Sequence, residues 1–126
     1  MVFRMEKQKT ASTPYVLIEE DRGYVKIEGR CFHENTAEFF YEIDTWFESY
    51  LKTDFKSLTF DCIMDYFNSS ALKALSNIIL CMDKYSCGKN NVFINWIVTE
   101  GNETVIEIGG DFKSDVKNLT FNLVIN

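Results

Sequence analysis

Proline, glycine, histidine and long apolar runs are all scarce in this sequence, and each scarcity excludes a class of protein. With 1 Pro, 6 Gly and 1 His among 126 residues, the chain is not collagen-like, proline-rich or of low complexity. Its longest unbroken apolar run, residues 78–82, falls far short of the roughly 20 residues that a membrane-spanning helix needs. The opening segment, MVFRMEKQKT, has no apolar stretch long enough for a secretory signal peptide. We therefore expect a cytoplasmic protein that does not enter a membrane.

Basic residues are outnumbered, which argues against a nucleic-acid partner. Lys and Arg total 13 against 19 Asp and Glu, giving a formal net charge of −6, whereas phosphate backbones are bound by clustered Lys and Arg. What the chain does contain is apolar material, because 46% of its residues are hydrophobic and 15% are aromatic. This content is typical of a globular protein, and the length suits one domain, since most domains have about 100 to 150 residues.

Residues that hold metals or perform catalysis are also few. A tetrahedral zinc site usually shows two close pairs of ligands, but the four cysteines form no C-x-x-C pair and only His33 is available to join them. The sequence contains no glycine-rich phosphate loop, no G-x-S-x-G motif and no H-E-x-x-H motif, which mark common enzyme classes. We therefore expect no metal, no cofactor and no enzymatic activity. The cysteines are interpreted as free thiols: Cys31, Cys62, Cys81 and Cys87.

The beginning of the chain predicts a tail followed by a hairpin. Residues 1–12 are mostly polar and are expected to form a flexible tail, so that the domain spans residues 13–126. Two short runs rich in β-branched and aromatic residues, 15–20 and 24–28, flank the turn Asp21-Arg22-Gly23. Such a pair of runs around a glycine-containing turn is typical of an antiparallel hairpin.

The spacing of apolar residues after the hairpin predicts two long amphipathic helices. Asn35 precedes Glu38 by three residues, the spacing at which a cap residue and a carboxylate satisfy free backbone N–H groups. The first helix then carries one apolar stripe, and the second carries another that ends before Gly88, a usual stop residue. We expect both stripes to lie in the core, with four residues largely buried: Trp46, Phe47, Leu75 and Ile79.

The remaining apolar runs complete the order of elements. Residues 58–64, 92–99 and 120–125 read as strands, and residues 104–108 read as a short helix followed by a loop through Gly109-Gly110. The order β β α β α β (α) β predicts a single α/β (α+β) domain. Because strands alternate with helices after the hairpin, we expect a mixed sheet with both long helices packed on one face.

One polar segment stands out by its position, Asn68-Ser69-Ser70, where a predicted interior strand passes into the second long helix. In the simpler interpretation, Asn or Ser caps the helix by accepting a hydrogen bond from a free backbone N–H. The same helix start carries partial positive charge and free N–H donors, so it tolerates a phosphate group. A serine at this point can be phosphorylated without melting the helix, which is suited to a regulatory switch.

Several short segments occur in the order and spacing of a known family, from about Thr13 to the C-terminus. They are Thr13-Pro14, Ile27-Glu28-Gly29-Arg30, Glu34-Asn35, Glu38-Phe39-Phe40, Trp46, Tyr50-Leu51, Tyr66-Phe67-Asn68-Ser69-Ser70, Lys73, Ile94-Asn95-Trp96 and Phe121-Asn122-Leu123. On these residues the chain resembles the SiaC family, which are STAS-like bacterial regulatory phosphoproteins related to biofilm control. It departs from the family pattern at Ser69, where Thr is usual, and at His33, where Pro is frequent.

The resemblance implies a function and a set of site residues. A cognate serine/threonine kinase would phosphorylate Ser69, a PP2C-type phosphatase would reverse the modification, and the unmodified protein would bind a diguanylate cyclase, linking it to cyclic di-GMP and biofilm formation. The interface with the kinase and partner would include Asp65, Tyr66, Asn68, Ser70 and Lys73. The alternative is a STAS-like module whose Asn68-Ser69 end binds a small anionic metabolite.

Overall fold

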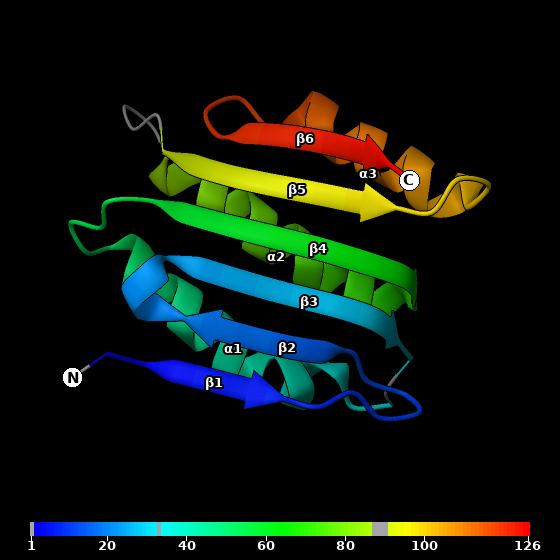
Figure 1. The fold of residues 1–126 in the computed structure, drawn as a ribbon, viewed down its shortest axis with the longest axis horizontal. Helices are drawn as coiled ribbons and strands as arrows, with labels where there is room; N and C mark the ends of the chain where they lie inside the picture. The colour runs from blue at the N-terminus through cyan, green and yellow to red at the C-terminus, as the bar shows by residue number, and fades with distance from the viewer. Residues whose placement is uncertain (1, 33, 87–90) are drawn as a thin grey trace.

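A six-stranded mixed sheet runs through the molecule in the computed structural model, which describes residues 2–32, 34–86 and 91–126. Figure 1 shows the sheet with three α-helices behind it. The strands are β1 (Arg4–Lys7), β2 (Tyr15–Glu19), β3 (Tyr24–Cys31), β4 (Leu58–Phe67), β5 (Val92–Val98) and β6 (Thr120–Ile125). The helices are α1 (Thr36–Leu51), α2 (Ser69–Tyr85) and α3 (Glu103–Asp115), and a short 3-10 turn covers Glu20–Arg22.

The strands lie side by side in the same order as in the sequence. β1, β2 and β3 are antiparallel neighbours, whereas β3, β4, β5 and β6 are parallel. Each parallel connection contains one helix and advances by one strand in the same direction. Because such crossovers are almost always right-handed, all the helices fall on one face, as Figure 1 shows. The predicted α/β class, the mixed sheet and the placement of both long helices on one face are confirmed.

The hairpin of β2 and β3 turns at Gly23. Tyr15 pairs with Glu28 and Glu19 pairs with Tyr24, and Gly23 adopts a left-handed backbone with φ of 59°. A side chain there would also collide with the chain, because a Cβ atom would lie 2.0 Å from the Ser57 carbonyl oxygen. Glycine therefore serves both the turn and the close approach of the loop before β4.

The expectation that residues 1–12 form a flexible tail is wrong for Arg4–Lys7, which form the edge strand β1. Arg4 pairs with Glu19 and Lys7 pairs with Val16, while Met5 is buried against the core. Only one residue of this strand faces the core, and its neighbours are charged, so the apolar alternation is too short to be recognised in the sequence. Ion pairs also connect β1 to its neighbours: Arg4 pairs with Glu19 of β2, and Lys7 pairs with Glu42 of α1 at 3.3 Å.

The apolar stripes of α1 and α2 form the core, as predicted. Trp46 is 5% exposed, and Phe47, Leu75 and Ile79 are exposed by 1% or less. Trp46 keeps a polar contact at the edge of the core, since its Nε1 donates a hydrogen bond to Glu20 Oε1 at 2.9 Å. Gly88, the predicted end of the second helix, lies outside the described residues.

The third helix is longer than the sequence indicates. The loop expected at Gly109 and Gly110 is instead the middle of α3. A Cβ atom on Gly109 would lie 2.4 Å from the Trp96 ring, so the glycine lets α3 approach β5 closely rather than breaking the helix. Gly110 has open space at the corresponding position.

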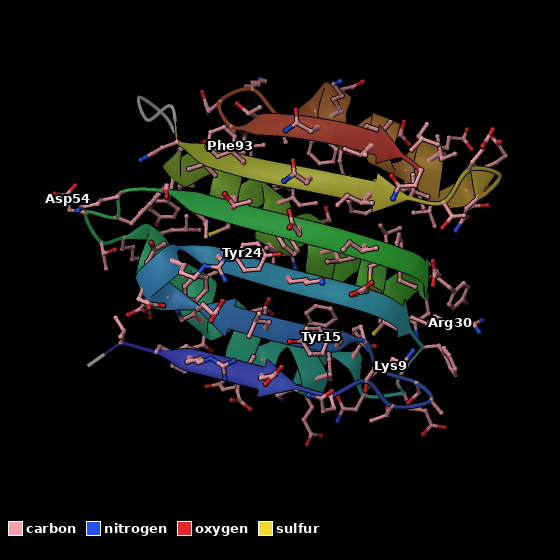
Figure 2. The ribbon with its side chains drawn as sticks, in the orientation of Figure 1. Lys9, Tyr15, Tyr24, Arg30, Asp54 and Phe93 are labelled. Atoms are coloured by element: carbon pink, nitrogen blue, oxygen red, sulfur yellow. The ribbon has the colours of Figure 1, made fainter. Side chains whose placement is uncertain are left out.

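No helix or strand of the described residues covers the face of the sheet opposite the helices, and this face carries a ladder of polar side chains. Tyr24 donates to Asp61 Oδ2 at 2.7 Å, Asn95 donates to Asp61 Oδ1 at 2.8 Å, and Asn122 donates to Asn95 Oδ1 at 2.9 Å. Burial and the bond to Asp61 raise the pKa of Tyr24 above its ordinary value. Figure 2 shows this face toward the viewer, with Tyr24 and Phe93 among its side chains.

Among the described residues, no helix is long and apolar enough to cross a membrane.

Candidate functional site

The junction between β4 and α2 lies at the carboxyl end of the sheet. β4 continues to Phe67, beyond the predicted end at residue 64. Asp65 and Tyr66 therefore belong to the strand, and both are exposed near its end. Asn68 is the cap of α2: its Oδ1 accepts the N–H of Ala71 at 2.9 Å, and its own N–H donates to the Cys31 carbonyl at 3.0 Å. The cap is thereby fixed both to the helix and to the neighbouring strand β3.

Ser69 and Ser70 are the first two residues of α2, and both are exposed. The side chain of Asn68 caps only the N–H of Ala71, and the backbone N–H groups of the two serines form no hydrogen bond with a described residue. Free N–H donors at a helix start give the site partial positive charge. The Ser69 hydroxyl is therefore reachable from solvent without unfolding, beside two donors that suit an anionic group.

Lys73 lies one turn after Ser69 and borders two clefts. One cleft, of about 370 Å³, separates α2 from α3 and contains Ser69; the other, of about 380 Å³, separates α2 from α1 and contains Ser70. The charges facing Lys73 are acidic. They are Asp111 and Asp115 in the first cleft, and Glu34 and Asp44 in the second.

An exposed aromatic cluster adjoins the junction; the sequence analysis named Tyr66 for the interface but missed its ring partner Phe32. The rings of Phe32 and Tyr66 meet edge to face with centroids 6.3 Å apart. The Arg30 guanidinium lies 5.7 Å from the Phe32 centroid and 6.0 Å from the Tyr66 centroid, although both rings are more than 40% exposed. Exposed aromatics beside arginine are typical of protein–protein interfaces.

A change of strand register creates this cluster. Gly29 pairs with Met64 but Arg30 pairs with Tyr66, so one residue of β4 is skipped, and Gly29 has a φ of 129°. The Gly29-Arg30 pair was visible in the sequence as a family segment, but its effect on side-chain direction was not. On the far side of the junction, the Asp65 carbonyl accepts a hydrogen bond from Asn102 Nδ2 at 2.9 Å, which ties the start of α3 to the site.

The structure brings together every residue predicted for the interface. Asp65, Tyr66, Ser69, Ser70 and Lys73 are exposed, and Asn68 is half-buried. His33 and Cys87 lie outside the described residues. Cys31 and Cys62 are buried and Cys81 is half-buried, and in the described part of the chain no group of three metal-ligating side chains converges.

Comparison with known proteins assigns the family. The sequence model of the SiaC family regulatory phosphoproteins matches residues 7–126. The chain belongs to this family. The chain is thus a SiaC-family regulatory phosphoprotein. An uncharacterized protein of Pseudomonas aeruginosa (strain UCBPP-PA14) is 28% identical over 106 residues, covering 84% of each chain.

Solved SiaC structures share the fold over nearly the whole chain. Apo-SiaC from Pseudomonas aeruginosa superposes with a TM-score of 0.86 at 23% identity, covering 97% of this chain and 98% of that one. A second match has a TM-score of 0.90 at 25% identity, covering 97% of this chain and 99% of that one. It comes from the crystal structure of the diguanylate cyclase SiaD in complex with its activator SiaC, from Pseudomonas aeruginosa.

Proposed function

We propose that this SiaC-family protein is a cytoplasmic, non-enzymatic switch that is controlled by phosphorylation of Ser69. A serine/threonine kinase adds the phosphate, a PP2C-type phosphatase removes it, and the unmodified form binds and regulates a diguanylate cyclase. The output is then cyclic di-GMP and biofilm formation. The observation that carries this proposal is the exposed Ser69 at the start of α2, next to backbone N–H groups that Asn68 leaves free.

The fold is expected to survive the modification. A phosphate adds about −1.5 to −2 charges near neutral pH, and a helix start stabilises such charge by roughly 0.3 to 1 kcal/mol at an exposed site. Lys73 follows Ser69 by four residues, a spacing at which side chains on a helix are neighbours. Both features favour a phosphate that stays on a folded α2.

Partner binding is expected to respond strongly. The phosphate would join Asp111 and Asp115 at the α2–α3 cleft and turn that side of the junction strongly anionic. A partner surface that is complementary to the hydroxyl would then have to desolvate a dianion without a matching cation, which costs several kcal/mol. Since each 1.4 kcal/mol is a factor of ten in affinity, phosphorylation should release the partner.

Binding measurements with matched variants test this mechanism. The partner is a purified diguanylate cyclase from the same genome, starting with the one encoded nearest to this protein. Ser69→Ala should bind constitutively in the presence of the kinase, Ser69→Asp should bind more weakly, and Ser70→Ala should still be released by phosphorylation. Intact mass should show one phosphate on the wild type and none on Ser69→Ala. Equal affinity of the phosphorylated and unmodified wild type would refute the switch, and weaker binding accompanied by unfolding would favour a purely structural cap.

Binding of an anionic metabolite at the Asn68-Ser69 end has less support. The carboxylates of Asp111 and Asp115 line the cleft that holds Ser69, against the single ammonium group of Lys73. This arrangement repels a diffusible anion, whereas a covalent phosphate is held there by its ester bond.

A further inference from the structure

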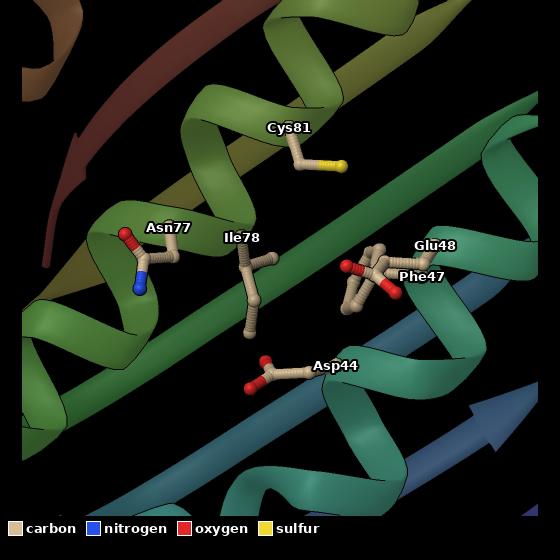
Figure 3. A pocket seen from close by; sticks show the side chains of 6 residues that line it. All are labelled: Asp44, Phe47, Glu48, Asn77, Ile78 and Cys81. Carbon is tan, nitrogen blue, oxygen red and sulfur yellow. The ribbon is translucent and has the colours of Figure 1, made fainter.

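The cleft beside Ser70 and Lys73 continues between α1 and α2 into a second cavity. This cavity has a volume of about 270 Å³ and shares Asp44 and Asn77 with the cleft. Figure 3 shows Asp44 and Glu48 projecting from α1, and Ile78 and Cys81 projecting from α2, toward the space between the helices. The two hollows therefore form one groove, which we call the α1–α2 groove. Its second cavity is lined by Asp44, Phe47, Glu48, Asn77, Ile78 and Cys81.

Asp44 is the unusual member of this lining. Its Oδ1 atom is shielded from solvent but accepts no hydrogen bond from any described residue. A shielded carboxylate oxygen without a donor costs free energy. Burial, together with the nearby Glu48 carboxylate, raises the pKa of Asp44 to about 6. The described residues thus supply no donor to the shielded oxygen, and a ligand entering from solvent would reach this half-buried carboxylate through its other oxygen, Oδ2.

The groups around Asp44 combine negative charge with an apolar floor. On its own helix, Glu48 follows four residues later and is exposed. From α2, Asn77 and Cys81 face the cavity, and the pKa of the Cys81 thiol is raised by burial and by Glu48, so this thiol stays neutral. Lys73 and Glu34 border the connected cleft, but no described cation forms an ion pair with Asp44. The floor consists of two buried residues, Phe47 and Ile78.

We propose that the α1–α2 groove binds an arginine side chain of the partner protein, with the guanidinium bonded to Asp44 and Glu48 and the aliphatic stem lying over Phe47 and Ile78. Guanidinium offers several donors in a planar fork, which suits two carboxylates on successive helical turns better than a single ammonium does. Its methylene groups pack on apolar surface while the charged head remains polar. This inference rests on the proposed function for the identity of the partner. It extends the contact surface from the Ser69 junction along α1.

A small-molecule probe tests the groove without any partner. Ethylguanidinium chloride is titrated into the ¹⁵N-labelled full-length protein near neutral pH, and amide chemical shifts are followed. Saturable shifts should appear in α1 and α2 around Asp44 and Asn77, vanish in Asp44→Asn and persist in Asp54→Asn. Asp54 is an exposed residue of the loop after α1, so this control makes the same chemical change elsewhere. No shifts in the groove, shifts unaffected by Asp44→Asn, or equal shifts with ethylammonium would each overturn the assignment to arginine.

Affinity for the cyclase provides the second test. Asp44→Asn should weaken binding by at least about tenfold, although it should raise Tm, because it removes an unsatisfied charge. Asp54→Asn should bind as the wild type does. Equal cyclase affinity for Asp44→Asn and wild type, or a fall in the Tm of Asp44→Asn, would show an ordinary structural carboxylate and overturn the inference.

The two tests separate this inference from the proposed function. If the wild type binds no diguanylate cyclase, the proposed function fails and the ethylguanidinium titration alone decides whether the groove binds a guanidinium. If the wild type binds the cyclase and phosphorylation releases the cyclase, but Asp44→Asn binds the cyclase as tightly as the wild type does, the switch stands and the groove inference is wrong.

Discussion

Replacing Gly109 and Gly110 with alanine, one at a time, tests how tightly α3 packs on the sheet. The two glycines are adjacent in the middle of α3, but only Gly109 faces β5. A Cβ atom there would lie 2.4 Å from Trp96 Cδ1, 2.5 Å from its Nε1 and 3.0 Å from a methyl carbon of Leu123. At Gly110 a Cβ atom would meet nothing within 4 Å. The same chemical change therefore meets opposite surroundings at neighbouring positions.

The two variants should differ in sign. Alanine is favoured over glycine inside a helix by about 0.8 to 1 kcal/mol, so Gly110→Ala should stabilise the protein by up to about that amount. Gly109→Ala gains the same preference, but it must displace a ring that is 1% exposed, and overpacking typically costs about 1 to 3 kcal/mol. It would also disturb the hydrogen bond from Trp96 Nε1 to the Val105 carbonyl, 3.0 Å long, which contributes about 1 kcal/mol. We expect Gly109→Ala to be about 2 kcal/mol or more less stable than Gly110→Ala.

Urea unfolding followed by far-UV circular dichroism measures both free energies, and tryptophan fluorescence reports whether the Trp96 environment shifts. At roughly 3 to 5 °C per kcal/mol for a chain of this size, thermal melts should separate the variants clearly. Equal stability of the two variants would mean that a Cβ atom at position 109 fits between α3 and β5, and that close packing against Trp96 does not require a glycine there.

Three further predictions concern stability and its dependence on pH. Trp46→Ala should lower the free energy of unfolding by about 3 to 5 kcal/mol in urea titrations, and a loss below about 1 kcal/mol would contradict its place in the core. Burial opposes ionisation of Asp83, but N–H bonds from residues 117–119 outweigh it and lower its pKa; the stability that it adds is thus present above about pH 4 and lost as pH falls through the folded-state pKa. Asp83→Asn should therefore cost about 1.5 to 3 kcal/mol near neutral pH and much less near pH 2, and an equal loss at both would refute this assignment. The pH dependence due to Asp44 runs the other way, because its pKa is raised from 3.8 to about 6. The stability of the wild type is therefore highest with respect to this group below about pH 4 and falls as pH rises through 6. The Tm of Asp44→Asn should accordingly rise relative to that of the wild type across this interval.

The main elements and the candidate serine were predictable because their signals are local. The stripes of α1 and α2 repeat every three or four residues, and the cap at Asn35 and the segment around Ser69 are short motifs at fixed spacing. Ser69 was singled out by its position between a strand and a helix and by the family resemblance. Its role as the phosphorylated residue stays a prediction.

What the sequence did not reveal depends on contacts between distant segments. β1 has a single core residue, Met5, and is recognisable only through its pairing with β2. The reason for a glycine at position 109 is its contact with Trp96, which lies on another element, β5. The exposure of Phe32 and Tyr66 depends on the register change at Gly29, and the shielded oxygen of Asp44 depends on the packing of α2 against α1. None of these features leaves a periodic pattern in its own segment.

The order of the strands has a consequence for how the chain acquires its structure during synthesis. Each strand after the first pairs with the strand that precedes it in the sequence. The pairing partner of every new strand has therefore already been synthesised when that strand leaves the ribosome. Loop closures stay short, which favours fast folding, because no strand has to pair with a segment made much earlier. The Ser69 junction follows the fourth of the six strands, so four strands of the sheet are synthesised before α3, which forms one wall of the site.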